Sequence, residues 1–162
     1  MGLSGALQEG PGMSKMRERL IGAWTLVSYV LDASDGSEPI HPMGADPRGF
    51  IMYTPDGYMS AQLMRTGRPA FASGNPAHGT PEEFTAAVRG YLAYSGSFRT
   101  DDVNETVTHA ADVSLFPNWV DVDQVRRVAF DGDLLKLSTV RPTVAGGRQF
   151  AAHLTWRRAL PR

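Results

Sequence analysis

The chain has 162 residues, with 16 Lys and Arg against 17 Asp and Glu, and it contains no cysteine. A chain of this length forms one domain with a substantial core, and its near-zero net charge provides no basic surface for nucleic acid or an anionic membrane. The absence of cysteine excludes disulfides, thiol catalysis and thiolate metal sites.

No segment of the sequence is typical of membrane insertion or export. Apolar runs fall short of the roughly 18 residues that a membrane-spanning helix needs, and the N-terminus lacks the charged start and apolar centre of a signal peptide. Residues 1–16 are rich in Gly and show no periodicity, so we expect a flexible tail followed by one domain over residues 17–162. These features predict a cytoplasmic protein without membrane or nucleic-acid partners, and they leave a homodimer open.

Strand-forming residues dominate the first part of the domain. After a short helical turn over residues 16–20, residues 24–31 are rich in β-branched and aromatic side chains, which is typical of a strand. Residues 49–54 and 58–64 are predicted to form a hairpin. The intervening sequence, residues 55–57, supports this because Pro presets a turn and Gly permits positive φ after it.

A long loop over residues 65–81 leads into the one inserted helix that the sequence predicts. Thr80 has the position of an N-cap, Pro81 that of the first helical residue, and acidic residues follow in the first turn. Apolar residues then recur at helical spacing, so we expect this helix to pack one stripe against the sheet. That stripe consists of Phe84, Ala87, Val88, Tyr91 and Leu92.

The rest of the chain is predicted to form strands that follow one another in meander order. The expected ranges are 97–100, 106–115, 122–131, 134–140 and 149–158. About eight strands in this order expose two edges unless the sheet closes on itself. The predicted fold is therefore an all-β, antiparallel up-and-down barrel of about eight to ten strands, wide enough for side chains or one small ligand.

Two of these strands place polar residues on an otherwise apolar face. At period two, His109 shares its face with Val107, Ala111, Val113 and Leu115. On the next strand, Gln124 and Arg126 share theirs with Val122, Val128 and Phe130. Burying such side chains inside a closed sheet costs free energy unless they are hydrogen-bonded, paired with a charge or hydrated. They therefore indicate a cavity with polar groups. The alternative for His109 is a core histidine bonded to a Tyr or to a carbonyl, and Arg126 is favoured over Arg127 as the inward residue.

Further candidates for the cavity wall are aromatic residues and one methionine. Core packing is the alternative for the tyrosines. Trp119 follows a Pro-Asn corner, where it could cover an open end of the barrel, and Met52 would add a deformable apolar surface. The predicted ligand-binding residues are Tyr53, Met52, Tyr58, Tyr91, His109, Trp119, Gln124 and Arg126.

Motifs for metals, nucleotides and serine hydrolysis are missing from the sequence. No two histidines have the spacing of a helical metal site. There is no Gly-x-Gly-x-x-Gly after a strand, no phosphate loop and no Gly-x-Ser-x-Gly. We therefore predict neither a metal nor a cofactor.

Several stretches between Leu20 and the end of the chain match a known pattern: LIGAWTLVSY (20–29), GFIMYTPDGYMSA (49–61), VTHAADVSLFPNW (107–119) and LTWRR (154–158). Through them the chain resembles the lipocalin-like domain family of bacteria and fungi, whose members often lie beside secondary-metabolite enzymes. The resemblance implies a ligand-binding barrel in which Trp24 closes the base beneath Arg157 or Arg158. Secreted lipocalins carry a signal peptide and a disulfide, and this sequence shows neither.

These features lead to two functional hypotheses and one structural alternative. In the first, the barrel encloses a small, mostly apolar, oxygen-bearing molecule that His109, Arg126 and a Tyr orient. In the second, the protein is a cofactor-independent isomerase or cyclase of polyketide-like metabolism. There His109 would shuttle a proton, and Arg126 or Tyr94 would stabilise an enolate-like oxygen. In the structural alternative, the barrel is filled by its own side chains.

Overall fold

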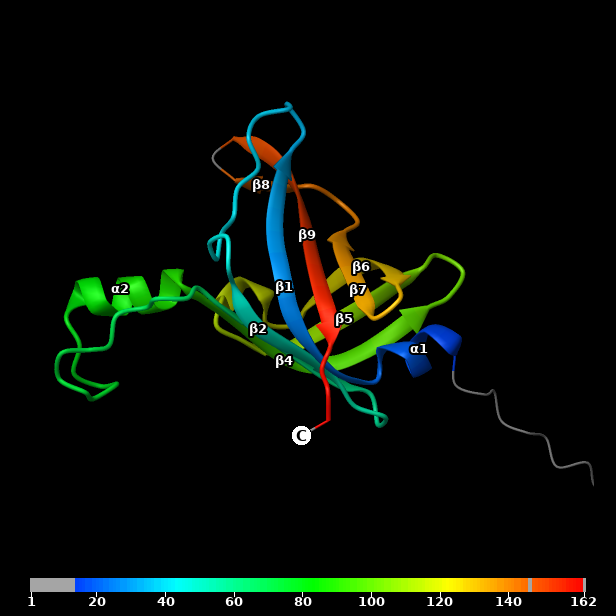
Figure 1. The fold of residues 1–162 in the computed structure, drawn as a ribbon, viewed down its shortest axis with the longest axis horizontal. Coiled ribbons are helices and arrows are strands. Elements are labelled where there is room, and N and C mark those ends of the chain that lie inside the picture. The colour runs from blue at the N-terminus through cyan, green and yellow to red at the C-terminus, as the bar shows by residue number, and fades with distance from the viewer. Residues whose placement is uncertain (1–13, 146, 162) are drawn as a thin grey trace, which may run out of the picture.

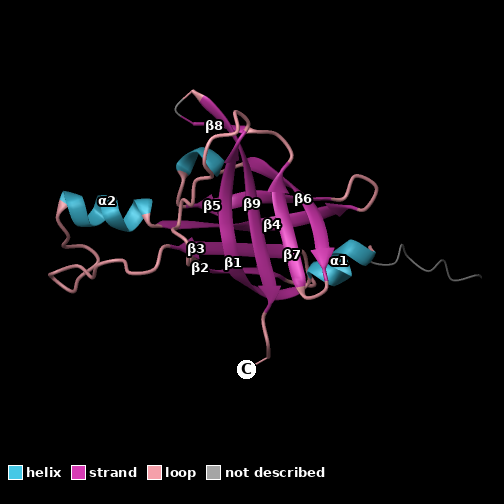
Figure 2. Cartoon of the chain, turned by 45° about the horizontal axis from the view of Figure 1, so that its top comes forward, coloured by secondary structure: helices cyan, strands magenta, loops and turns pink. Residues whose placement is uncertain are grey.

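A single antiparallel sheet, rolled into a barrel, makes up most of the molecule (Figures 1 and 2). The computed structural model describes residues 14–145 and 147–161. Its strands are β1 (Gly22–Ala33), β2 (Arg48–Tyr53), β3 (Tyr58–Met64), β4 (Tyr91–Asp101), β5 (Thr106–Ser114), β6 (Val122–Asp131), β7 (Leu134–Thr139), β8 (Thr143–Ala145) and β9 (Arg148–Arg158). The helices are α1 (Lys15–Leu20), α2 (Pro81–Arg89) and the 3₁₀ turn η1 (Pro117–Trp119).

The sheet closes because its last long strand returns to its first. Pairing runs from β1 through β7 to β9, and β9 also pairs with β1 from Trp24 to Ala33. Eight strands form the ring, while the short β8 pairs with the N-terminal end of β9. Closure removes the two edges that an open meander would expose. The predicted all-β, up-and-down barrel is confirmed.

One end of the barrel is closed by α1 and by a stacked Trp–Arg pair. Leu20 and Trp24 are buried, and the indole N–H of Trp24 donates to the Leu20 carbonyl at 2.8 Å. The guanidinium of Arg158 lies 3.9 Å from the Trp24 ring centroid and donates to the Ile21 carbonyl at 2.9 Å. Arg158, and not Arg157, thus holds the position that the resemblance implied. The barrel is therefore closed at this end.

Helix α2 begins where the sequence predicts. The Thr80 hydroxyl accepts the N–H of Glu83, and the Glu83 carboxylate accepts the N–H of Thr80. This reciprocal capping box satisfies two amide groups that the helix itself leaves without acceptors. The local signal alone is sufficient to set this end of the helix.

The predicted packing of this helix is wrong. Phe84 and Val88 are 40% and 55% exposed, no residue of α2 is buried, and the helix extends away from the barrel (Figure 1). The helix ends at Arg89 with Gly90 as its C-cap, and β4 begins at Tyr91. Tyr91 and Leu92, which the helical period had included, therefore belong to a strand that starts at 91 and not at 97.

A bulge in β5 changes which side chains face the interior. The pairing of β4 with β5 shifts register at Gly96, where Asp112 is the extra residue. Side chains alternate as predicted up to Ala111, but beyond the bulge Val113 and Leu115 are 62% and 39% exposed. An extra residue reverses the in–out alternation of a strand. The prediction that these last two side chains point inward was therefore wrong.

The boundary between the tail and the domain stays a prediction. Residues 1–13 of the predicted tail lie outside the described residues, and α1 starts at Lys15, within the range expected to be tail. None of the helices in the described part of the chain is long and apolar enough to cross a membrane.

Candidate functional site

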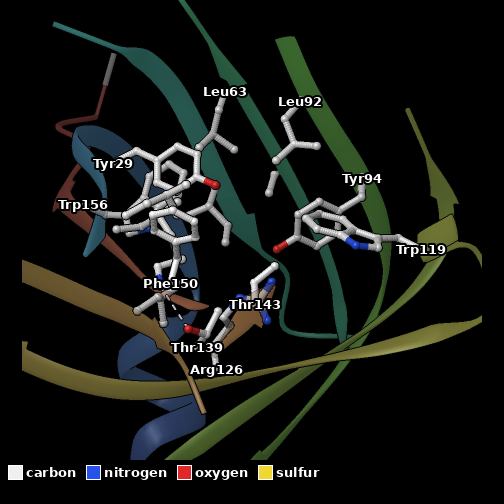
Figure 3. A pocket seen from close by; sticks show the side chains of 16 residues that line it. Tyr29, Leu63, Leu92, Tyr94, Trp119, Arg126, Thr139, Thr143, Phe150 and Trp156 are labelled. Atoms are coloured by element: carbon white, nitrogen blue, oxygen red, sulfur yellow. Dashed lines mark hydrogen bonds between the residues drawn. The ribbon is translucent and has the colours of Figure 1, made fainter. Parts of the chain in front are cut away.

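The half of the barrel away from α1 contains a cavity of about 140 Å³ (Figure 3). Its apolar lining consists of Leu31, Ile51, Ala61, Leu63, Leu92, Trp119, Leu137, Phe150, Ala152, Leu154 and Trp156. Its polar lining consists of Tyr29, Tyr94, Arg126, Thr139 and Thr143. An apolar cavity of this size admits a single aromatic ring. This half of the barrel is therefore not filled by its own side chains.

Arg126 brings a positive charge into this cavity. It is the inward residue of the Arg126–Arg127 pair, as predicted. Its guanidinium donates to the Val125 carbonyl at 3.0 Å and to Oε1 of Gln124 at 3.2 Å. Within the described residues, no carboxylate forms an ion pair with it. The charge thus has neutral partners only.

His109 is completely buried beside the cavity, between two tyrosines. The Tyr53 hydroxyl lies 2.8 Å from Nε2, and the Tyr94 hydroxyl lies 2.9 Å from Nδ1. Burial, assisted by the positive charge of Arg126, lowers the pKa of His109 to about 3. The ring is therefore neutral near pH 7, and a neutral imidazole donates through one nitrogen and accepts through the other.

The two tyrosines consequently have different roles in this chain of hydrogen bonds. Tyr53 is 2% exposed, and its hydroxyl has no other acceptor among the described residues. If it accepted from His109, its own proton would be buried without a partner, which costs about 1–3 kcal/mol. The arrangement therefore favours Tyr53 donating to Nε2, and Nδ1–H donating to Tyr94. The Tyr94 hydroxyl can then donate its proton to an acceptor in the cavity.

Other hydrogen-bond donors also surround the cavity. Burial raises the pKa of Tyr29, Tyr53 and Tyr94, with a smaller opposing effect of Arg126, so all three hydroxyls keep their protons. In Figure 3 the hydroxyls of Tyr29 and Tyr94 point into the same space from opposite sides. The buried indole N–H of Trp156 has no acceptor within the part of the chain that the structure describes. A ligand oxygen could accept a hydrogen bond from Tyr29, Tyr94 or Trp156.

The structure brings five of the predicted ligand-binding residues together. Trp119 and Arg126 line the cavity, and the Trp119 ring meets that of Tyr94 edge-on with centroids 5.4 Å apart. Tyr53 and His109 lie behind Tyr94 and reach the cavity only through its hydroxyl. Gln124 faces inward beside Arg126, without lining the cavity itself. Tyr94, predicted for catalysis alone, is a direct part of the wall.

Three predicted ligand contacts are wrong. Met52 and Tyr58 are 43% and 57% exposed because the alternation of β2 and β3 turns them outward. Tyr91 is on the outer face of β4, where its hydroxyl donates to Gln62 and Arg68 lies over its ring. Both faces of these strands carry large apolar residues, so hydrophobicity at period two did not distinguish the inside from the outside.

Sequence reasoning missed Tyr29 as a cavity residue. Counting by two from Trp24 places Tyr29 on the outer face, but the pairing of β1 with β9 shifts register between Leu26 and Ser28. This irregularity turns Tyr29 into the cavity, and the residues around it carry no signal for it. Within the described ranges, no three His, Asp or Glu side chains are close enough to hold a metal ion.

Comparison with known proteins agrees with this geometry. The family model for the lipocalin-like domain matches residues 21–159, which include every strand from β1 to β9. A curated relative from Aspergillus oryzae, described as the 4'-hydroxy-3'-methoxypropiophenone carrier protein ppsC, is 44% identical over 110 residues. The alignment covers 64% of this chain and 98% of the relative.

Proposed function

Since the chain belongs to the family of lipocalin-like domains, we propose that it binds one small, mostly apolar, oxygen-bearing molecule inside its barrel. The observation that carries this proposal is a cavity of about 140 Å³ with an apolar wall and a few converging donors. Ligand sites generally combine such a wall with a small number of polar groups that fix orientation. Tyr29 and Tyr94 provide polar groups on opposite sides of the cavity, and Arg126 provides a third (Figure 3).

We infer that the ligand is an aromatic ring that carries a carbonyl or hydroxyl group. The name of the Aspergillus oryzae relative describes a carrier of a phenolic aryl ketone. The cavity volume suits one aromatic ring, and the hydroxyls of Tyr29 and Tyr94 can meet oxygens at two positions on it. This ligand class belongs to secondary metabolism, as the family resemblance implies. A cytoplasmic location and a possible homodimer stay predictions.

A carrier function is favoured over the alternative function of an isomerase or cyclase. Both ring nitrogens of His109 are hydrogen-bonded to tyrosines, and the residue does not line the cavity. With its pKa near 3, the ring is a poor proton donor near pH 7. His109 therefore orients Tyr94, and a catalytic role for Tyr94 and Arg126 stays a prediction.

Filling the cavity should abolish most of the binding. Ala152→Leu adds three carbons to the wall of the cavity, and we expect at least a tenfold loss of affinity for 4'-hydroxy-3'-methoxypropiophenone, equivalent to about 1.4 kcal/mol. Isothermal titration calorimetry measures the affinity. Ala151→Leu adds the same atoms on the outer face of β9 and should bind like the wild type.

Thermal unfolding of both variants would show that each is folded before the titration. If Ala152→Leu bound the ketone as tightly as Ala151→Leu, the ligand would lie outside the barrel. If the wild type bound neither this ketone nor related aryl ketones, the proposed ligand class would be wrong.

A further inference from the structure

The charge of Arg126 has a consequence for the ionisation state of the ligand. A cation that is partly removed from water is costly unless an opposite charge or several hydrogen bonds compensate for the lost hydration. Arg126 has one carbonyl and one amide oxygen as partners, and no carboxylate pairs with it within the described residues. A ligand oxygen that carries negative charge would supply the missing compensation.

The tyrosine chain prepares a second group for such an oxygen. Tyr94 and Arg126 line the same cavity, from β4 and β6 (Figure 3). In the favoured arrangement, in which Tyr53 donates to Nε2 and Nδ1–H donates to Tyr94, the Tyr94 hydroxyl is left as a donor. Hydrogen bonds from neutral and charged donors to an ionised oxygen are stronger than those to a neutral one. Both groups therefore favour an anion over a neutral oxygen.

No group of the protein around the cavity competes for the proton that the ligand would lose. The titratable groups that face Arg126 are Tyr29 on β1, Tyr53 on β2, Tyr94 on β4 and His109 on β5. Their shifted pKa values keep all four neutral between about pH 5 and pH 8, the range in which an ordinary histidine would titrate. The lining contributed by β3, β7, β8 and β9 contains no titratable side chain.

From these observations we propose that the cavity binds its aromatic ligand as a phenolate, with the ionised oxygen held by Arg126 and Tyr94. The inference rests on the proposed function. On binding, the phenolic O–H bond breaks heterolytically, the electron pair remains on the ligand oxygen and the proton passes to the buffer. Arg126 lowers the pKa of the bound phenol because an adjacent positive charge favours the ionised form. Arg126 is thus the residue that selects acyl phenols over neutral aryl ketones.

The test compares two ligands that differ in one methyl group. 4'-Hydroxy-3'-methoxypropiophenone can ionise, whereas 3',4'-dimethoxypropiophenone cannot. At a pH below the pKa of the free phenol, we expect the wild type to bind the phenol at least tenfold more tightly. The bound phenol should show the longer-wavelength absorption band of its phenolate. Calorimetry in buffers of different ionisation enthalpy should record the release of close to one proton for each ligand bound.

Variants at Arg126 and at its outward neighbour separate charge from structure. Arg126→Gln should lose the phenolate band and bind the two ketones within about twofold of each other, and Arg126→Lys should retain part of the band. Arg127 is exposed on the outer face, so Arg127→Gln should behave as the wild type. The absorption of the wild-type complex tests the proposal even if an Arg126 variant does not fold.

The two proposals fail in different ways. If the wild type binds both ketones equally and shows no phenolate band, the phenolate inference is overturned while ligand binding in the barrel stands. If the wild type binds neither ketone, the proposed function fails, and the inference fails with it. If the phenolate band persisted in Arg126→Gln, a group other than Arg126 would stabilise the ionised ligand, and the role proposed for Arg126 would be wrong.

Discussion

Acidification from pH 7 to pH 3.5 is expected to cost the fold about 4 kcal/mol through His109 alone. In the folded protein, burial and the charge of Arg126 hold the pKa of this ring at about 3. In the unfolded chain the ring has the ordinary value of about 6.5. Between these two values the unfolded state binds the proton and the folded state does not. Stability from this residue is therefore complete above about pH 6.5, falls as the pH decreases, and stops falling below about pH 3.

Urea denaturation at a series of pH values measures this effect as the difference in the free energy of unfolding between the wild type and a variant without the His109 ring. His109→Gln keeps a donor and an acceptor for the two tyrosines and removes the titration. The free energy of unfolding of the wild type, minus that of the variant, should fall by up to about 1.4 kcal/mol for each pH unit across this window. The exposed carboxylates with lowered pKa values, those of Asp35, Glu83 and Asp101, titrate in both proteins and cancel.

An exposed histidine provides the control for this experiment. His153 lies on the outer face of β9, where its ring is 49% exposed and pairs with Asp32 at 3.5 Å. His153→Gln should leave the acid dependence close to that of the wild type. A flat difference curve for His109→Gln would mean that the ring is not held neutral inside the barrel, and the orientation of Tyr94 would then lose its support.

The second large effect is expected at Gly96, where Ala should destabilise the barrel by about 3 kcal/mol or more, the upper range for overpacking. A Cβ at this position would lie 1.8 Å from the Ala110 carbonyl oxygen and 2.8 Å from the Asp112 nitrogen. All the nearest atoms belong to the backbone of β5, so no side chain can rotate away to make room. The bulge must open, and β4 and β5 must separate beside His109.

The neighbouring outward residue offers a matched control. Ser97→Thr adds one methyl group to the exposed face of the same strand and should change stability by less than about 0.5 kcal/mol, as surface substitutions usually do. Chemical denaturation of both variants provides the comparison. If Gly96→Ala were as stable as Ser97→Thr, the close approach of the two strands at the bulge would not exist in solution.

Local features of the chain were predictable from sequence because each depends on neighbouring residues. The N-cap at Thr80 and its partner Glu83 are three positions apart, and their hydrogen bonds form within one helical turn. The hairpin between β2 and β3 follows from residues 55–57, which favour a tight turn. The inward face of β9 follows from a regular strand in which Ala152, Leu154 and Trp156 alternate with the polar residues His153 and Thr155. Period-two analysis also placed His109 and Arg126 correctly.

Other features depended on contacts between residues far apart in the chain. Irregular pairing near Leu26 turned Tyr29 inward, and the extra residue Asp112 turned Val113 outward, although alternation predicted the opposite in both cases. Met52 and Tyr58 were assigned to the cavity because an apolar pattern on two faces does not show which one will be enclosed.

The sequence by itself therefore determined most of the strands, the turns, the start of the capped helix and the closed all-β fold. Only the tertiary structure decided which faces of β1, β2 and β3 became the inside, where the cavity lies, and that Tyr94 stands between His109 and the cavity. The physical reason is that hydrophobic alternation specifies the period of a strand, whereas its phase is reset at every bulge. The phase of a strand, which is the choice of the face that points inward, is set by its partner strand. That partner can lie anywhere along the chain.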